Sequence, residues 1–420
     1  MTDFDRREFL IAAGGLAAVS LMPEVLPAAL RLNESLRVGL VGVGRQGRAI
    51  LAELAKMPAI KVVAACDTDE ARRTSAATRA PGAEVFSDHR AMLDKTKDLS
   101  AVIIATPTHE HKSVALDAVA AGKHVYCEAP LAHTVDDARA IARAASGARK
   151  VFAVGHEGRS NPVYGLARTF FKTDAFKDMI SMRAAFAQKT SWRVPAADAA
   201  REKVLNWRLD PELSTGMMGE IGSHQLDVFH WYRGRFPVAV RGRGSIRLHA
   251  DGRTLADTVH ADLEFDDGAM LSYSATLGNS YEGRYEIMQG SASAIRLAWT
   301  HGWMFKESDA PTQGWEVYAN RQQFHRDVGI TLIADATKLA SQNKLKDGVG
   351  LPESSLFYAL EKFAGLAGGG DGSGGGAGES TKTSICTAEE GFRTAVVSIL
   401  ADQAVRRNTE IRIDPEQLKL

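Results

Sequence analysis

Three residues with side chains suited to proton transfer stand close together in mid-chain: Glu220, His224 and Asp227. On a helix, positions i, i+4 and i+7 share one face, so this spacing predicts two carboxylates on the same side as an imidazole. An imidazole has an ordinary pKa of about 6.5 and can accept a proton from a hydroxyl near neutral pH, while a neighbouring carboxylate fixes its tautomer. A lone histidine among apolar residues is more often structural, so the rest of the chain must decide between these interpretations.

A glycine-rich turn near the start of the chain favours the chemical interpretation. An apolar run from Leu36 is followed by Gly42, Gly44 and Gly47, and Arg45 to Met57 has apolar residues at helical spacing. Strand, glycine turn and helix with this spacing predict a dinucleotide-binding turn, with the pyrophosphate on the free N–H groups of the helix.

An acidic residue at the end of the next strand indicates which dinucleotide is bound. The apolar run 60–66 is followed by Asp67, where a carboxylate would bind the hydroxyls of the adenosine ribose and repel a 2′-phosphate. We therefore predict NAD rather than NADP, and we expect Arg72 and Arg73 to face solvent.

Strands and helices alternate after this turn. Strands are predicted at 101–105, 124–127 and 151–155, with helices at 113–121 and about 135–145. Regular β-α-β alternation predicts a parallel sheet covered on both faces, with functional loops at the carboxyl ends of the strands.

The composition indicates a soluble globular protein of two domains. The chain has 420 residues, 45% of them hydrophobic, and its 51 basic and 51 acidic side chains balance. This balance gives no indication of nucleic acid or of an anionic membrane surface. Cys66, Cys127 and Cys386 fit no metal-binding spacing, so we expect small buried side chains and no metal.

Residues 1–30 are predicted to be an export signal rather than part of the fold. Arg6 and Arg7 precede an apolar run, 10–22, that is too short to span a bilayer as a mature helix. Paired arginines before Phe-Leu resemble a twin-arginine (Tat) signal, which implies the Tat translocon as a partner and a periplasmic or exported protein. Cleavage of the signal, or its retention as a membrane anchor, stays open.

Several further motifs resemble the Gfo/Idh/MocA family, the glucose–fructose oxidoreductase and inositol dehydrogenase group. The resemblance implies an α/β fold with an N-terminal Rossmann domain, 35–158, and an α+β C-terminal domain, 159–420, with an open, mostly antiparallel sheet. One departure is Ala129, which stands where the family has a lysine that serves proton chemistry. The matching pieces are Gly42-x-Gly44-x-x-Gly47, Asp67, residues 105–111, residues 121–125, Glu128-Ala129-Pro130, Gly155-x-x-x-Arg159 and the segment 214–227.

The resemblance also assigns roles. It implies that His224 is the base, with Glu220 and Asp227 beside it. Arg159, His156, Trp192 and Trp207 are predicted to bind substrate. The predicted cofactor-binding residues are Gly42, Gly44, Arg45, Gln46, Gly47, Asp67, Thr106, Pro107, His109, His111 and Glu128.

The second half of the chain predicts strands at 238–247, 258–265, 269–276 and 285–288 with no helix between them, hence an antiparallel sheet. Its exposed face is predicted to form a homo-oligomer. Trp303, Trp315 and Tyr318 either line the site or pack, and residues 365–380 are predicted to be a flexible glycine-rich loop.

Three functions follow as hypotheses. The first is an exported NAD(P)-dependent oxidoreductase acting on a secondary hydroxyl of a sugar or glycoside, with a tightly held cofactor recycled on the protein. The second is a redox-neutral NAD-dependent glycosidase. The third is a non-catalytic sugar- or NAD-binding protein, because Ala129 removes a catalytic group.

Overall fold

The computed structural model describes residues 35–314, 316, 321–324, 327–333, 350–369 and 385–420. The predicted signal, Trp315, Tyr318 and most of the glycine-rich loop lie outside these residues. Among the described residues, no helix is both long and apolar enough to cross a membrane.

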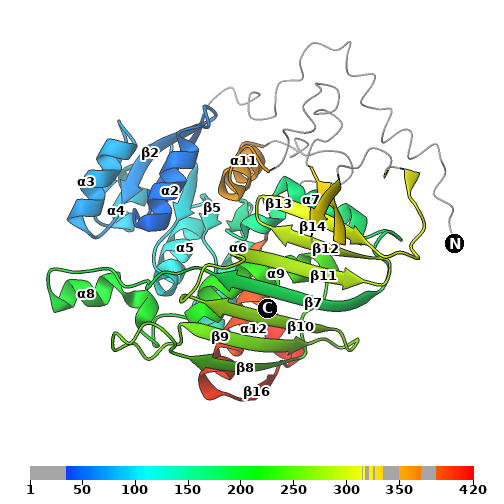
Figure 1. The fold of residues 1–420 in the computed structure, drawn as a ribbon. Coiled ribbons are helices and arrows are strands. Elements are labelled where there is room, and N and C mark those ends of the chain that lie inside the picture. Colours follow the sequence, from blue (N-terminus) through cyan, green and yellow to red (C-terminus); the bar gives the residue numbers. More distant parts are fainter. Residues whose placement is uncertain (1–34, 315, 317–320, 325–326, 334–349, 370–384) are drawn as a thin grey trace, which may run out of the picture.

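The first domain, blue to cyan in Figure 1, is built on a parallel sheet of order β3-β2-β1-β4-β5-β6. Its strands are almost wholly apolar because helices cover both faces. The strands are β1 Leu36–Val41, β2 Ile60–Cys66, β3 Glu84–Phe86, β4 Ala101–Ile104, β5 His124–Cys127 and β6 Phe152–Val154. The helices are α2 Arg45–Leu54, α3 Glu70–Arg79, α4 His89–Lys95, α5 His111–Ala120 and α6 Val135–Ser146, with a 3-10 turn η3 at Thr108–Glu110.

The second domain is a ten-stranded sheet of order β14-β15-β13-β12-β11-β7-β10-β9-β8-β16. All of its pairs are antiparallel except the pair of β7 and β10. The strands are β7 Met179–Ala187, β8 Ala239–Ser245, β9 Thr258–Glu264, β10 Met270–Thr276, β11 Arg284–Gly290, β12 Ser293–Ala298, β13 His301–Lys306, β14 Arg321–Phe324, β15 Asp327–Leu332 and β16 Glu410–Arg412. The predicted fold class is confirmed.

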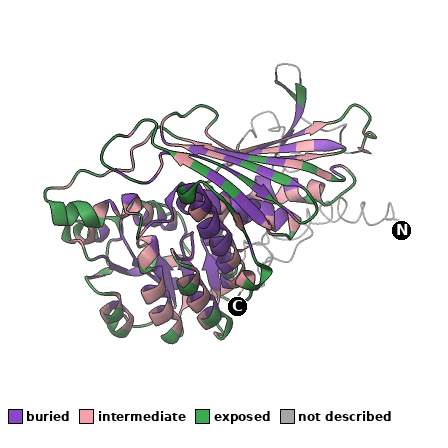
Figure 2. Cartoon of the chain, turned by 90° about the horizontal axis from the view of Figure 1, so that it is seen from below, coloured by how far each residue is buried: buried purple, intermediate pink, exposed green. Residues whose placement is uncertain are grey.

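Helices cover one face of this sheet, and buried residues fill the space between them (Figure 2). Buried and more exposed residues alternate along β9, where Val259, Ala261 and Leu263 are buried. One face of the strand therefore points toward the core. The helices of the second domain are α7 Pro162–Phe171, α8 Ala199–Leu205, α9 Ser223–Arg233, α11 Ser355–Ala367 and α12 Ala388–Arg407, with short turns η4 Glu157–Ser160, η5 Trp207–Leu209, η6 Met218–Gly222 and η9 Pro415–Leu418. Of these, α8 has no buried residue and is not part of the covering layer.

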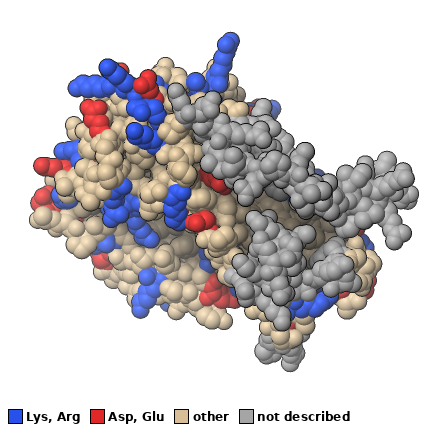
Figure 3. Space-filling model, turned by 90° about the horizontal axis from the view of Figure 1, so that it is seen from above, with Lys and Arg blue, Asp and Glu red and all other residues tan. Residues whose placement is uncertain are grey.

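Two late helices join the domains. α12 packs against α6 of the first domain and against β8 and α9 of the second. α11 packs on α2, where Leu360 and Phe363 belong to the core of the nucleotide domain. The relative position of the two domains is therefore set by buried apolar contacts. On the face shown in Figure 3, basic and acidic side chains are interspersed, as the balanced composition leads one to expect.

Candidate functional site

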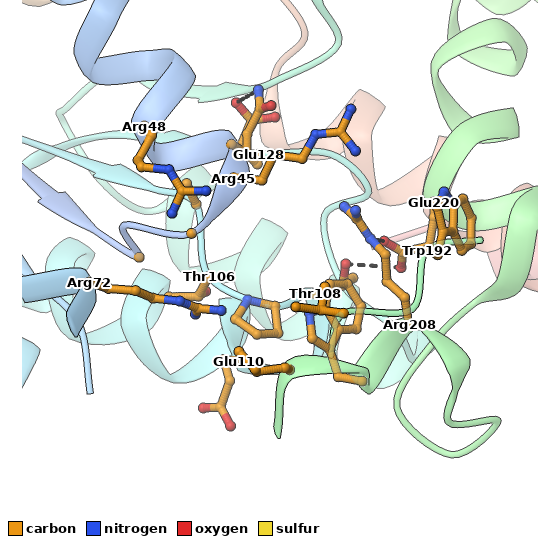
Figure 4. Close-up of a pocket in the computed structure, with 18 of the residues that line it drawn as sticks. Arg45, Arg48, Arg72, Thr106, Thr108, Glu110, Glu128, Trp192, Arg208 and Glu220 are labelled. Carbon is orange, nitrogen blue, oxygen red and sulfur yellow. Dashed lines mark hydrogen bonds and ion pairs between the residues drawn. The ribbon is translucent and has the colours of Figure 1, made fainter. Parts of the chain in front are cut away.

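A cavity of about 2110 Å³ opens between the carboxyl edge of the parallel sheet and the second domain (Figure 4). The turn between β1 and α2, the ends of β2, β4 and β5, the segment 186–213 and the start of α9 contribute to its walls. Ligand pockets commonly measure about 300–1,000 Å³, so this cavity has room for a dinucleotide and a second molecule.

The glycine turn at one end fits a dinucleotide. Gly42 has φ +92°, and a Cβ there would lie 2.5 Å from the carbonyl of Ala105. A Cβ on Gly47 would lie 1.9 Å from the carbonyl oxygen of Gly42, so both glycines are required by the fold. Gly44 differs, because a Cβ there would meet only the guanidinium of Arg72, at 3.8 Å.

The space in front of Gly44 is thus open, and no side chain caps the start of α2. The first N–H groups of α2 are available for an anion, which is what a pyrophosphate requires. Arg45 and Arg48 line the same part of the cavity. The residues present therefore fit the nicotinamide dinucleotide that the sequence predicts.

Asp67 lies at the end of β2, facing this turn. Its two carboxylate oxygens accept from the backbone N–H groups of Val43, at 2.7 Å, and Asp69, at 2.9 Å. The expectation that Arg72 faces solvent is wrong: it lines the cavity, with Nη1 3.9 Å from Oδ2 of Asp67. Arg73 donates instead to the carbonyls of Asp67 and Thr68.

The loops after β4 and β5 form the next part of the wall. Thr106, Pro107 and His109 line the cavity, as does the edge of His111. The ring of His111 is braced by the carbonyls of Thr106, Pro130 and Leu131, and burial lowers its pKa to about 4. His111 therefore shapes the loop.

Burial raises the pKa values of three carboxyl groups in the wall, that of Glu220 and, by a larger shift, those of Glu128 and Glu157. Burial, together with Glu157, raises the pKa of Glu128 to about 8, and Gln46 donates to its Oε1 at 3.1 Å. Burial raises the pKa of Glu157 to about 7. Glu128 and Glu157 both line the cavity, so protonated acids stand in its wall near neutral pH.

Glu220 lies in η6, a π-helical turn directly before α9. Its carboxylate accepts from Thr108, at 3.1 Å, from Arg208, at 3.2 Å, and from Thr215, at 3.3 Å. The bond to Thr108 crosses from one domain to the other. No hydrogen bond to His224 is found, so in this structure Glu220 orients Arg208 and the loop after β4 rather than the imidazole.

Arg208 is held from three sides. Its guanidinium lies 5.7 Å from the ring centre of Trp192 and 5.1 Å from that of Trp207, and its Nε donates to Glu220. All four side chains line the cavity, and Figure 4 labels Arg208, Trp192 and Glu220. Trp192 has φ +61°, an unfavourable conformation for a bulky residue, so its placement is imposed by the surrounding structure.

His224 lines the cavity from the first turn of α9. Burial lowers its pKa well below the ordinary value, and neighbouring His156 and the Arg284 guanidinium lower it further. The imidazole is therefore neutral near pH 7, with an Nδ1 that has no hydrogen-bond partner among the described residues. A neutral ring facing a cavity can accept a proton.

The structure does not bring Asp227, Arg159 or His156 to the cavity wall. Asp227 and Arg159 are completely buried and bind each other, so their predicted contacts with the imidazole and the substrate are not present. His156 packs edge-on against His224, with ring centres 5.4 Å apart, and so supports the imidazole from behind.

The position of the missing lysine faces the cavity, because Ala129 is part of the wall. Neither His133 nor His156 takes its place among the described lining residues. Two arginines of the second domain do supply positive charge there: Arg208 and Arg284, the latter stacked 3.7 Å from the centre of Trp299.

Cys386 lies near two potential metal ligands, His156 and Asp227, that are far from it in the sequence. Single ligand atoms of His156, Asp227 and Cys386 lie within 4.8 Å of one another. Arg159, however, donates to both oxygens of Asp227, so a cation already occupies this position. All three cysteines are free and buried, as predicted.

Sequence reasoning missed Arg72, Glu157, Arg208, Arg284 and Trp299 as lining residues. Arg208 could have been predicted as a lining residue, because it directly follows Trp207 in an irregular segment rich in polar and aromatic residues. Arg284 and Trp299 come from β11 and the end of β12, and only the sheet topology brings them to the cavity.

Comparisons with known proteins agree with this architecture. Residues 36–156 match the model of an oxidoreductase family with an NAD-binding Rossmann fold, and residues 164–295 match the GFO/IDH/MocA C-terminal domain. A levoglucosan dehydrogenase of Pseudarthrobacter phenanthrenivorans is 31% identical over 48% of this chain and 52% of its own length. The match thus spans about half of that relative. An inositol 2-dehydrogenase of Saccharopolyspora erythraea is 26% identical over 63% of this chain and 73% of its own length.

Among solved structures, a levoglucosan dehydrogenase in complex with NADH and L-sorbose superposes with a TM-score of 0.69 at 21% identity, covering 91% of this chain and 99% of that one. This likeness shows a shared fold. With models of both domains of one family matching in order, and together covering more than half of the residues, the chain belongs to the Gfo/Idh/MocA family, and its first domain is an NAD-binding Rossmann domain.

Proposed function

We propose that the protein oxidises a secondary hydroxyl of a sugar or glycoside with NAD as its cofactor. The observation that carries the proposal is the position of His224, a neutral, half-buried imidazole in the wall of the cavity that also holds the glycine turn. The relatives named for levoglucosan and inositol oxidation support a polyhydroxylated substrate.

Different residues of the chain would bind the cofactor, accept the proton and stabilise the developing charge. NAD, when bound at Gly44 and Asp67, supplies the hydride acceptor. His224 accepts the hydroxyl proton, and the cations of Arg208 and Arg284 stabilise the negative charge that develops on the substrate oxygen. Trp192 and Trp207 line the cavity, and aromatic rings suit the apolar C–H surfaces of a sugar.

A screen of free sugars, glycosides and aryl glycosides tests the proposal. Nicotinamide absorbance and bond cleavage are followed in the same samples. We expect an absorbance change with at least one class of substrate, and its loss in His224→Ala. His230→Ala is the matched control, because His230 lies on the same helix but stacks on Phe236 outside the cavity. Sugar binding without an absorbance change or cleavage would instead indicate a non-catalytic binding protein.

A redox-neutral glycosidase is the second candidate. A glycosyl hydrolase family 109 protein of Shewanella sp. is 26% identical over 50% of this chain, and the protonated acids Glu128 and Glu157 offer a proton to a leaving oxygen. In such a cycle, transient oxidation acidifies a neighbouring C–H bond, elimination cleaves the glycoside and the hydride returns. Cleavage without a net change of absorbance would favour this candidate.

We further propose that the enzyme is exported with its NAD held and recycled on the protein. The paired arginines Arg6 and Arg7 support Tat export, and free NAD is not expected outside the cytoplasm. Replacing both arginines with lysine should leave the protein in the cytoplasm, and unchanged periplasmic delivery would contradict the proposal. The exposed face of the ten-stranded sheet is the proposed homo-oligomer interface, which sedimentation of the purified protein would test.

A further inference from the structure

The segment 191–213, here called the α8 arm, connects β7 to η6 in the second domain but extends along the first (Figure 1). Its helix, α8, has no buried residue. A helix of seven residues with no buried side chain gains little from packing within the chain alone. Its placement therefore calls for a further partner.

The arm turns apolar side chains toward the cavity. Val204 is 63% exposed and Val194 is 45% exposed, and both line the cavity, as do Pro195, Ala197 and Leu205. Exposed apolar side chains that gather at a cavity wall indicate a surface that is covered when a ligand is bound.

The tip of the arm is tied to the loop that follows β2. Arg201 forms an ion pair with Asp69 at 2.8 Å, and the N–H of Asp69 donates to Asp67. The arm therefore meets the first domain two residues from the carboxylate that fits the adenosine ribose. Exposed ion pairs are weak, so this contact can open and close.

The base of the arm is fixed to the second domain. Arg193 pairs with Asp251 at 3.0 Å, and Arg253 donates to the carbonyl of Ser191 at 2.6 Å. Within the arm, the side chain of Asn206 bonds both the N–H and the carbonyl of Val194 and so joins its two ends. With a fixed base and a tip held by one weak ion pair to Asp69, the arm is built to close over the loop after β2.

We propose that the α8 arm binds the adenosine half of the cofactor and holds it in the cleft. Val194 and Val204 cover the apolar surface of the adenosine, and the pair of Arg201 and Asp69 closes the cleft over it. This rests on the proposed NAD binding and adds the second-domain element that retains the nucleotide.

The test measures nucleotide retention rather than turnover. Purified protein is loaded with labelled NAD. An excess of unlabelled NAD is then added, and the loss of label from the protein gives the rate of NAD dissociation. The variants are Arg201→Gln, Asp69→Asn and Val204→Ser. Asp69→Asn keeps the side-chain oxygen that caps α3. Arg235→Gln and Ile246→Ser are matched controls, since the first breaks another exposed 2.8 Å pair and the second changes another exposed apolar residue outside the cavity.

Each single variant should speed NAD dissociation by about 2–5-fold, with both controls unchanged. The double variant of Arg201 and Asp69 should match either single variant, because both remove the same interaction. Bound NAD should also protect Arg201 and Lys203 from trypsin in the wild type. None of these measurements requires a substrate, so they separate the arm from the proposed oxidation. Wild-type dissociation rates in all three variants, or cleavage of the arm at the same rate with and without NAD, would overturn the proposal.

Discussion

Arg159 donates to both carboxylate oxygens of Asp227, from Nε and from Nη2, at 2.8 Å each. The Arg159 guanidinium is fully buried and also pairs with Glu390 of α12, at 2.5 Å. Burial alone would raise the pKa of Asp227, but the guanidinium beside it holds that pKa well below its usual range. Two residues expected to serve chemistry thus hold η4, α9 and α12 together within the second domain.

Replacing Arg159 with Met should destabilise the protein strongly. Removing one partner of a buried pair leaves a buried charge without compensation, which costs about 3–5 kcal/mol. Thermal unfolding measures the effect. Arg393→Met, which removes a more exposed partner of Glu389 on the same helix α12, should shift the melting temperature little. Equal effects of the two substitutions would contradict the assignment.

Substitutions at two glycines of the turn, Gly44 and Gly47, should have separate effects on stability and on cofactor binding. Gly47→Ala places a Cβ against the carbonyl of Gly42, so stability should fall by about 1–3 kcal/mol. A Cβ at position 44 has space, so the melting temperature of Gly44→Ala should stay unchanged. The NAD affinity of this variant should fall about tenfold, because the added methyl keeps the backbone from the pyrophosphate. Unfolding and nucleotide titration on both variants check the contrast. A loss of stability in Gly44→Ala with NAD affinity intact would contradict it.

The architecture could be read from the sequence because it rests on local patterns. Buried parallel strands are continuous apolar runs, and β9 alternates visibly, so the strand at 124–127 has the predicted bounds and the strand at 258–265 ends one residue earlier than predicted. Gly42 and Asp67 were also accessible, since the turn and the following strand lie within one short stretch of chain.

The site could be predicted only in part because its remaining residues meet through long-range packing. The helical spacing correctly linked Glu220 and His224 to one wall, but a π-helical turn precedes α9, and the partner of Asp227 is 68 residues away. No local pattern indicates that Arg159 would neutralise Asp227, or that Arg284 would reach the cavity from β11.

The pH dependence of turnover should reflect the low basicity of His224. Its pKa lies well below the ordinary value because of burial, His156 and Arg284. The base is neutral, and therefore active, above its pKa. Because Glu128 and Glu157 also line the cavity and have pKa values of about 8 and about 7, the profile is measured in a variant with both changed to Gln, where kcat/KM should stay level as the pH falls from 8 through 6.5. Arg284→Gln removes a cation and should move the acidic limb upward by about one unit. A limb at or above 6.5 in the variant without these two carboxyl groups would contradict this assignment of the base.

The raised pKa of Glu128 should lower the free energy of unfolding as the pH rises. Burial and Glu157 raise its pKa to about 8 in the folded protein, against an ordinary value of 4.5. Below the ordinary value both folded and unfolded states hold the proton, so the group has no effect. Between the two values the unfolded chain releases the proton while the folded protein keeps it, and stability declines with rising pH.

Glu128→Gln removes this dependence because an amide does not ionise, and it keeps an oxygen to accept from Gln46. The variant should therefore gain melting temperature relative to the wild type at pH 9, where the carboxylate is ionised in the cavity wall, and gain little at pH 5. Glu110→Gln is the control, since Glu110 also lines the cavity with a side chain that is 55% exposed. A Glu128→Gln effect that is the same at both pH values would show that the group ionises alike in the folded and unfolded chain.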